Sequence, residues 1–122
     1  MLILALLTLF LMQTKHLIVD WVWQPPYEHQ NKGTYGHWGG IQHAGKNAIG
    51  TGLCLLVLVS PIVALHLAMV DFLVHYHIDW TKVNLNRTFA LNPQNAVFWW
   101  LTGFDQYLHQ VTYLALVGFV LT

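Results

Sequence analysis

The longest uncharged stretch of the chain limits its fold most strongly. No Asp, Glu, Lys or Arg occurs between Lys46 and Asp71, and the apolar region around this stretch covers roughly 47–80. Charged residues make up only 8% of the chain, whereas soluble proteins average about 25%. A compact soluble protein of this size needs more charge to cover its surface. We therefore predict an all-α membrane protein whose principal partner is the lipid bilayer.

The middle apolar region is too long for one membrane crossing. It spans about 34 residues, or roughly 50 Å as a helix, whereas about 20 residues cross the hydrocarbon core. Ser60-Pro61 lies within it, and the residue before a proline is biased away from helical geometry. We therefore predict two helices joined by a tight turn. The alternative is one long helix kinked at Pro61, which transmembrane helices tolerate.

Two further apolar regions, roughly 2–23 and 96–121, each fit one crossing. The prediction is a single domain, a polytopic bundle of four transmembrane helices. The helices are expected at about 2–23, 41–59, 62–81 and 95–121, with interfacial loops at 24–40 and 82–94.

The basic residues indicate the orientation of this bundle. With four spans, the two loops lie on one side of the membrane, and Lys32, Lys46, Lys82 and Arg87 lie in them or at their margins. Lys15 is near the same end of the first helix. Basic residues gather on the cytoplasmic side of membrane proteins. We expect a bacterial inner membrane protein whose two termini lie outside the cytoplasm.

Histidine and aspartate occur four residues apart in three of the predicted helices. Residues at this spacing share one face of a helix. Each of these helices therefore offers a carboxylate and an imidazole in one direction, near the cytoplasmic side of the bilayer. The residues are His16 and Asp20 in the first helix, Asp71, His75 and Asp79 in the third, and Asp105 and His109 in the fourth.

An ionised aspartate inside a membrane is costly unless it is paired, and such groups are candidates for functional sites. Imidazole and carboxylate are also ligands for Zn, Mn and Fe. We predict a site for one or two divalent metal ions, with His43 contributing from the second helix. The predicted ligands are His16, Asp20, His43, His75, Asp79, Asp105 and His109, and the other members of the polar cluster are Gln24, Lys32, Asp71 and Lys82.

The four remaining histidines are expected to lie outside this cluster. His66 and His77 are on other faces of the third helix than His75, and we expect His66 to pack or to hydrogen-bond between helices. His29 and His37 lie in the first loop and are expected to be solvated.

Several of these residues fall in motifs that resemble a known family. "HLIVDWVWQ" supplies His16, Asp20 and Gln24, then Lys32 and His43 follow, and a later His-x3-Asp-x2-Lys is matched by His75, Asp79 and Lys82. In these motifs the chain resembles domain of unknown function 3307, a family of small bacterial and phage membrane proteins. The resemblance supports the site residues but implies no activity. The chain also looks like a distant analogue of membrane-bound metal-dependent hydrolases.

Three functions remain open at this point. The first is a metal-dependent hydrolase acting on a membrane-embedded or headgroup substrate, in which Lys32 or Lys82 holds a phosphate. The second is a non-enzymatic binder or conductor of metal ions or protons, which would need a homo-oligomer. The third is a structural or interaction protein of phage origin. The zero formal charge argues against nucleic acid as a partner.

Overall fold

The computed structural model describes all of residues 1–122 and consists of helices without any β-strand. The expected all-α class is confirmed. The elements are α1 (Leu2–His16), a π-helical segment η1 (Leu17–Val22), α2 (Pro26–Asn31), α3 (Trp38–Leu55), α4 (Pro61–Thr88) and α5 (Ala96–Leu121).

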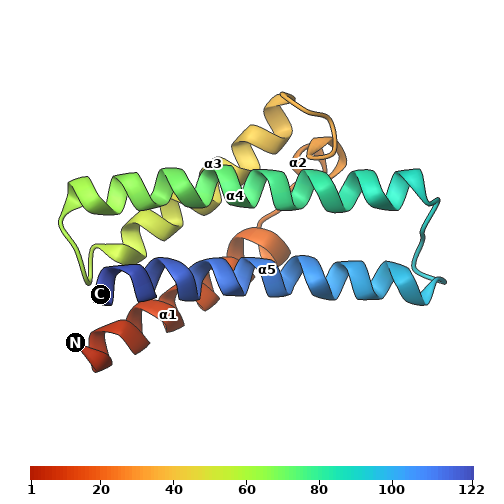
Figure 1. The fold of residues 1–122 in the computed structure, drawn as a ribbon. Helices are drawn as coiled ribbons and strands as arrows, with labels where there is room; N and C mark the ends of the chain where they lie inside the picture. Colours follow the sequence, from red (N-terminus) through yellow and green to blue (C-terminus); the bar gives the residue numbers. More distant parts are fainter.

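The two longest helices, α4 and α5, run antiparallel beside each other (Figure 1). The most extensive packing in the bundle is between α3 and α4, while α1 packs against α3 and α5. Both termini lie at the end of the bundle that holds the α3–α4 turn, and the α4–α5 loop lies at the opposite end (Figure 1).

The chain turns between α3 and α4 at the expected serine-proline step. Ser60 is extended, with φ −64° and ψ 156°, and Pro61 is the first residue of α4. Proline suits this position because its missing N–H would have no partner in the first helical turn. The chain therefore adopts two helices and not one helix kinked at Pro61.

Helix α4 continues past the expected end at 81 and reaches Thr88. The segment 82–94 is therefore not all loop, and the connection to α5 shortens to 89–95. No glycine or proline occurs between Pro61 and Pro93, so nothing in the sequence stops the helix earlier. It ends where Ala90 takes a positive φ of 50°.

Two segments are long and apolar enough to cross a membrane, judged by length and composition: Leu2–Val22 and Pro61–Thr88. Only two segments therefore meet this criterion, whereas four were expected. The other two long helices do not meet this criterion, because polar residues interrupt the apolar sequence near the middle of each helix. These are Lys46 and Asn47 in α3, and Asp105, Gln106, His109 and Gln110 in α5.

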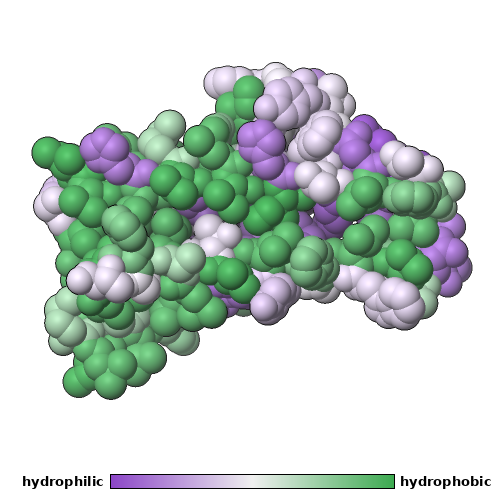
Figure 2. Space-filling view, viewed as in Figure 1, coloured by the Kyte–Doolittle hydropathy of each residue, from purple (hydrophilic) through white to green (hydrophobic).

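Apolar side chains cover much of the outside of the bundle. Figure 2 shows that hydrophobic atoms dominate the visible face over α4 and α5. Leu65 on α4 and Phe119 on α5 are 63% and 69% exposed. The hydrophobic surface therefore faces outward, while several of the most polar side chains are buried.

Small residues on α3 allow its close approach to α4. Ala44 and Ala48 are buried, and a Cβ atom added at Gly52 would lie 3.3 Å from the Cβ of Ala68. The four-residue spacing of these three positions puts them on one face of the helix. This packing brings His43 on α3 next to His75 on α4.

Candidate metal centre

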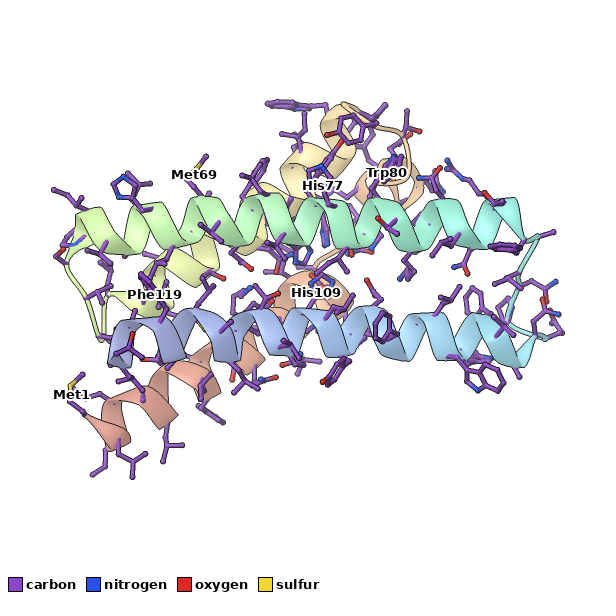
Figure 3. The ribbon with its side chains drawn as sticks, viewed as in Figure 1. Met1, Met69, His77, Trp80, His109 and Phe119 are labelled. Atoms are coloured by element: carbon purple, nitrogen blue, oxygen red, sulfur yellow. The ribbon has the colours of Figure 1, made fainter.

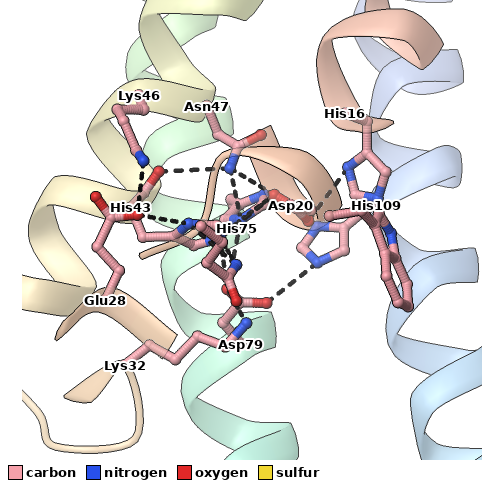
Figure 4. Close-up of polar contacts among 12 residues, drawn as sticks. His16, Asp20, Glu28, Lys32, His43, Lys46, Asn47, His75, Asp79 and His109 are labelled. Carbon is pink, nitrogen blue, oxygen red and sulfur yellow. Dashed lines mark hydrogen bonds and ion pairs between the residues drawn. The ribbon is translucent and has the colours of Figure 1, made fainter. Parts of the chain in front are cut away.

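Buried polar side chains from η1, α3, α4 and α5 meet inside the bundle, at the middle of α4 and α5 (Figures 3 and 4). Figure 3 shows His109 pointing from α5 toward α4, whereas Met69 on α4 points outward. His43, His75 and His109 are each at most 1% exposed, and Asp79 and Asp105 are each 3% exposed. Burial of this many ionisable groups is costly unless they are paired or bind a cation.

The π-helical segment η1 sets the direction of Asp20. The N–H of Trp23 donates to the carbonyl of Ile18, five residues earlier, at 2.6 Å. A π-helix holds more residues per turn than an α-helix, so Asp20 does not simply repeat the direction of His16. Asp20 Oδ1 faces α3, where it accepts a hydrogen bond from Asn47 Nδ2 at 2.8 Å.

His16 instead faces α5. Its Nε2 lies 2.7 Å from Gln106 Oε1, and its Nδ1 lies 3.0 Å from the hydroxyl of Tyr113. His16 Nδ1 is also 3.4 Å from Asp20 Oδ2. Both imidazole nitrogens of His16 therefore have polar neighbours other than the candidate metal ligands, and Nδ1 also lies beside the Asp20 carboxylate.

The centre of the cluster is a close pair of imidazole nitrogens. His43 Nε2 and His75 Nε2 are 3.2 Å apart. Asp79 Oδ2 lies 3.2 Å from the first and 3.5 Å from the second. Asp20 Oδ1 lies 3.3 Å and 3.8 Å from the same two nitrogens. The four atoms thus form two triangles that share the imidazole–imidazole edge.

These separations match those of a metal coordination shell. Zinc–nitrogen and zinc–oxygen bonds of 2.0–2.1 Å in a tetrahedron put neighbouring ligand atoms about 3.3–3.4 Å apart. Each triangle has the size of one face of such a tetrahedron. Asp20, His43 and His75 form one group that could hold a metal ion.

A second group shares His75 with the first. His109 Nε2 lies 3.3 Å from Asp79 Oδ1 and 3.3 Å from Asp105 Oδ1. His75, Asp79 and His109 could also hold a metal ion. Asp79 therefore directs Oδ2 toward the His43–His75 pair of the first group and Oδ1 toward His109.

Two lysines compensate the buried carboxylates on the side of the α4–α5 loop. Lys32 Nζ lies 3.2 Å from Asp79 Oδ2, and Lys82 Nζ lies 3.2 Å from Asp105 Oδ2. Burial acts to lower the pKa of Lys32, but the carboxylates of Asp79, Asp20 and Asp105 outweigh it and raise this pKa above its usual value. Lys32 lies in the first loop, as expected, yet only 7% of it is exposed.

The imidazole of His29 is close to both lysines. Burial, together with the positive charges of Lys32 and Lys82, lowers the pKa of His29. Its Nδ1 lies 3.0 Å from Gln24 Oε1. Gln24 in turn brings its Nε2 within 3.1 Å of His43 Nε2, so it borders the cluster without being a metal ligand.

The second ring nitrogen of His43, Nδ1, faces the carboxylate of Glu28. Glu28 on α2 is 4% exposed, and its Oε2 lies 3.4 Å from His43 Nδ1 and 2.7 Å from Lys46 Nζ. Histidines that bind metals usually donate their other ring N–H to such a group, which fixes the tautomer and the ring orientation. His75 differs because its Nδ1 is buried without a hydrogen-bond partner.

Asp71 lies two helical turns from Asp79 and outside both groups. Its Oδ2 accepts a hydrogen bond from the Thr51 hydroxyl at 2.6 Å and lies 3.9 Å from Lys15 Nζ. Lys15 also donates to Asn47 Oδ1 at 3.2 Å. Asp71 therefore belongs to a polar layer next to the cluster.

The remaining histidines lie outside the cluster. His66 is exposed, and its Nδ1 hydrogen-bonds within α4 to the carbonyl of Ile62 rather than between helices. His77 is also exposed and lies 3.0 Å from the hydroxyl of Tyr35. His37 caps the N-terminus of α3 by accepting a hydrogen bond from the Gly39 N–H.

Sequence reasoning missed several residues that contact the cluster. Asn47 and Tyr113 continue the four-residue steps of His43 on α3 and His109 on α5, so extending the pattern to uncharged side chains would have found them. No comparable signal marks Glu28, because it depends on how α2 folds back onto α3.

No curated protein and no solved structure matches the chain. One family model matches residues 6–122, which include every residue of the two candidate metal-binding groups. The family is described as "protein of unknown function (DUF3307)". On the strength of this match, the chain belongs to the DUF3307 family.

Proposed function

We propose that the protein is a polytopic membrane protein that binds a divalent metal ion between η1, α3 and α4. The observation that carries this proposal is the spacing of four buried ligand atoms, those of Asp20, His43, His75 and Asp79. Their separations of 3.2–3.8 Å suit a bound ion. A cation there would offset the repulsion between two buried carboxylates.

The chemistry of the ligand atoms limits which metal ions the site suits. It consists of imidazole nitrogens and carboxylate oxygens without a thiolate, because Cys54 is the only cysteine and lies outside both groups. This mixture suits Zn, Mn or Fe. A second ion is supported by Asp79 Oδ1, which approaches His109 rather than the first group. Asp79 would then bridge two ions, with Asp105 as a further ligand.

The reaction that such a centre supports best is hydrolysis of a membrane or headgroup substrate. A bound metal ion supplies a Lewis acid and an activated water. The ammonium groups of Lys32 and Lys82 lie 3.2 Å from Asp79 and Asp105. A metal ion bound by these carboxylates would free both ammonium groups to bind the substrate's negative charge. In a hydrolysis, water adds to the electrophilic atom, the bond to the leaving oxygen breaks, and the proton from water passes to the leaving group.

We further propose that α1–η1, α3, α4 and α5 are the four spans, in a bacterial inner membrane with the termini outside the cytoplasm. Support comes from the exposed apolar side chains along the bundle. Lys32, Lys82 and Arg87 also line one pocket, near the end opposite the termini. Such clustering agrees with the preference of basic residues for the cytoplasmic side.

A second candidate is a proton or metal-ion relay. It is favoured by the buried polar side chains that continue from Asp79 through His75 and Asn47 to Lys15 and Asp71. Chains of this kind carry protons in pumps and transporters. Ion flux into liposomes separates the two candidates, because a hydrolase passes no current.

The test of the metal site is the metal content of the purified protein, measured by mass spectrometry for wild type, Asp79→Asn and His66→Gln. Wild type and His66→Gln are expected to hold one or two ions per chain. Asp79→Asn is expected to lose them, because Asp79 belongs to the second group and its Oδ2 also lies 3.2 Å and 3.5 Å from the two imidazole nitrogens of the first. The matched control is His66, an exposed histidine on the same helix. Wild-type protein without bound metal after exposure to Zn, Mn and Fe would overturn the proposal.

The test of hydrolysis uses the same proteins in vesicles. Release of phosphate or headgroup from lipids is expected for wild type and His66→Gln, and it is expected to stop after chelation of the metal. Metal-loaded wild-type protein that conducts ions and releases no product would instead support the relay.

A further inference from the structure

An apolar groove runs along the contact between α4 and α5. Two cavities of 680 and 530 Å³ lie along this contact, and Val74, Ile78 and Leu108 line both of them. They therefore form one continuous groove. Along α4 it extends from Leu67 to Leu85, which is roughly 27 Å at helical rise. This length exceeds one leaflet of the hydrocarbon core, which is about 30 Å thick in total.

One end of the groove opens into a basic pocket. This pocket has a volume of 590 Å³, and its charged lining residues are Lys32, Lys82 and Arg87, together with His29 and without any acidic residue. Lys82 lines both the basic pocket and the apolar groove. In Figure 2, hydrophilic atoms are visible at the floor of a recess between α4 and α5, surrounded by hydrophobic atoms. The combined shape suits a molecule with an apolar tail and an anionic head.

Arg87 has a free charge to offer in this pocket. Each of the four lysines lies within 4.0 Å of a carboxylate oxygen, and Arg87 does not. Its Nη1 contacts only the carbonyl of Gly33, at 3.4 Å. A planar guanidinium without an acidic partner is well suited to bind the oxygens of a phosphate.

A bound metal ion would strengthen the case for an anion through the charge balance of the chain. The five acidic and five basic residues give a formal charge of zero. A divalent ion at Asp79 would add two positive charges to a buried site and compete with Lys32 for the carboxylate. Both effects favour a bound anion in the basic pocket, because unpaired buried charge is costly.

We propose that the groove and the basic pocket bind an anionic phospholipid. Its acyl chains lie between α4 and α5, and its phosphate contacts Arg87, Lys82 and Lys32. If the proposed function holds, such a lipid is also the substrate class of the hydrolase. The binding site itself depends only on the groove and the three cations.

The experiment labels metal-free protein in phosphatidylcholine vesicles with trace photoreactive phosphatidic acid. The comparison probes are a photoreactive phosphatidylcholine and a photoreactive diacylglycerol with the same chains. Phosphatidic acid is expected to label α4 and α5 at least tenfold more than either probe. Equal labelling by all three probes would overturn the proposal.

Three variants test the basic pocket. Arg87→Gln is expected to reduce labelling by phosphatidic acid about tenfold, the effect of losing a charged hydrogen bond. Arg87→Lys is expected to retain most of it, because the charge remains. Lys46→Gln removes a lysine that pairs with Glu28 outside the pocket and is expected to leave labelling unchanged. Unchanged labelling in Arg87→Gln would contradict the proposal.

Leu108→Trp tests the apolar groove, because Leu108 lines both of its parts. The larger side chain is expected to block the acyl chains and reduce labelling, with thermal unfolding as the check that the variant is folded. Dimers cross-linked across α4 and α5 would show that a second copy fills the groove, which overturns the proposal. Displacement of the lipid by millimolar inorganic phosphate would assign the pocket to free phosphate and also overturn it.

This design separates the two proposals. Labelling is measured without metal, so it can succeed even where the protein binds no metal ion. Conversely, metal-loaded protein that shows no preference for phosphatidic acid would overturn the lipid site alone.

Discussion

His43 and His75 bring their Nε2 atoms within 3.2 Å of each other in the interior of the bundle. Without a cation, this contact is favourable only where one of the two nitrogens carries a hydrogen and donates a hydrogen bond to the other or to a nearby carboxylate. With a cation between them and Asp79, both nitrogens can use their lone pairs as ligands. The stability of the bundle should therefore depend on metal.

We predict that zinc at 100 times its Kd raises the free energy of unfolding by about 2.7 kcal/mol. Thermal unfolding in detergent, with and without a chelator, measures this effect. The variant His75→Gln should lose the stabilisation, and His77→Gln, at an exposed histidine on the same helix, should keep it. An equal response of both variants would argue against the site.

Glu28→Gln is predicted to weaken metal binding. Glu28 Oε2 lies 3.4 Å from His43 Nδ1, and loss of such a partner costs about 10–100-fold in metal affinity. Competition with a fluorescent chelator measures the change in Kd. Glu28→Asp, which retains the charge, should restore part of the affinity. A merely structural role would lower the unfolding temperature and leave the Kd unaffected.

The close packing of α3 on α4 predicts the effect of filling Gly52. A Cβ at this position would already be 3.3 Å from the Cβ of Ala68, whereas one at Gly118 would meet no atom within 4 Å. Gly52→Ile should therefore destabilise the bundle by about 1–3 kcal/mol. Gly118→Ile should have little effect on thermal unfolding. Similar unfolding temperatures for the two variants would disagree with this packing.

Tyr113→Phe tests the polar layer beside the cluster. The Tyr113 hydroxyl accepts a hydrogen bond from Lys15 Nζ at 2.9 Å and lies 3.0 Å from His16 Nδ1. Its removal should cost about 1.5–3 kcal/mol, because a buried ammonium loses a partner. Tyr107 is 61% exposed, so Tyr107→Phe should be neutral. Chemical denaturation in mixed micelles can resolve this difference.

The proposed four-span topology predicts which positions react from each side of the membrane. In a Cys54→Ser background, Thr34→Cys and Ala90→Cys should react with an impermeant maleimide only in inverted vesicles. Ser60→Cys should react only in intact spheroplasts. Reaction of Ser60→Cys and Ala90→Cys from the same side would exclude α4 as a span.

The sequence predicts the helical class, the turn at Ser60-Pro61 and the three rows of Asp and His because each depends on local spacing. It does not predict η1, where a change from α- to π-helical hydrogen bonding separates the directions of His16 and Asp20. Glu28 was missed for a related reason, since its contact with His43 arises from the return of the short helix α2. Residues two turns apart, such as Asp71 and Asp79, share a face but reach different partners.

The position of the chain ends has a practical consequence. Both termini lie beside the α3–α4 turn, whereas Lys32 and Arg87 line the pocket near the other end. An affinity tag or a fluorescent protein fused to either end would therefore sit far from this pocket. Immobilisation through such a fusion would leave the basic pocket accessible to vesicles and to added ions.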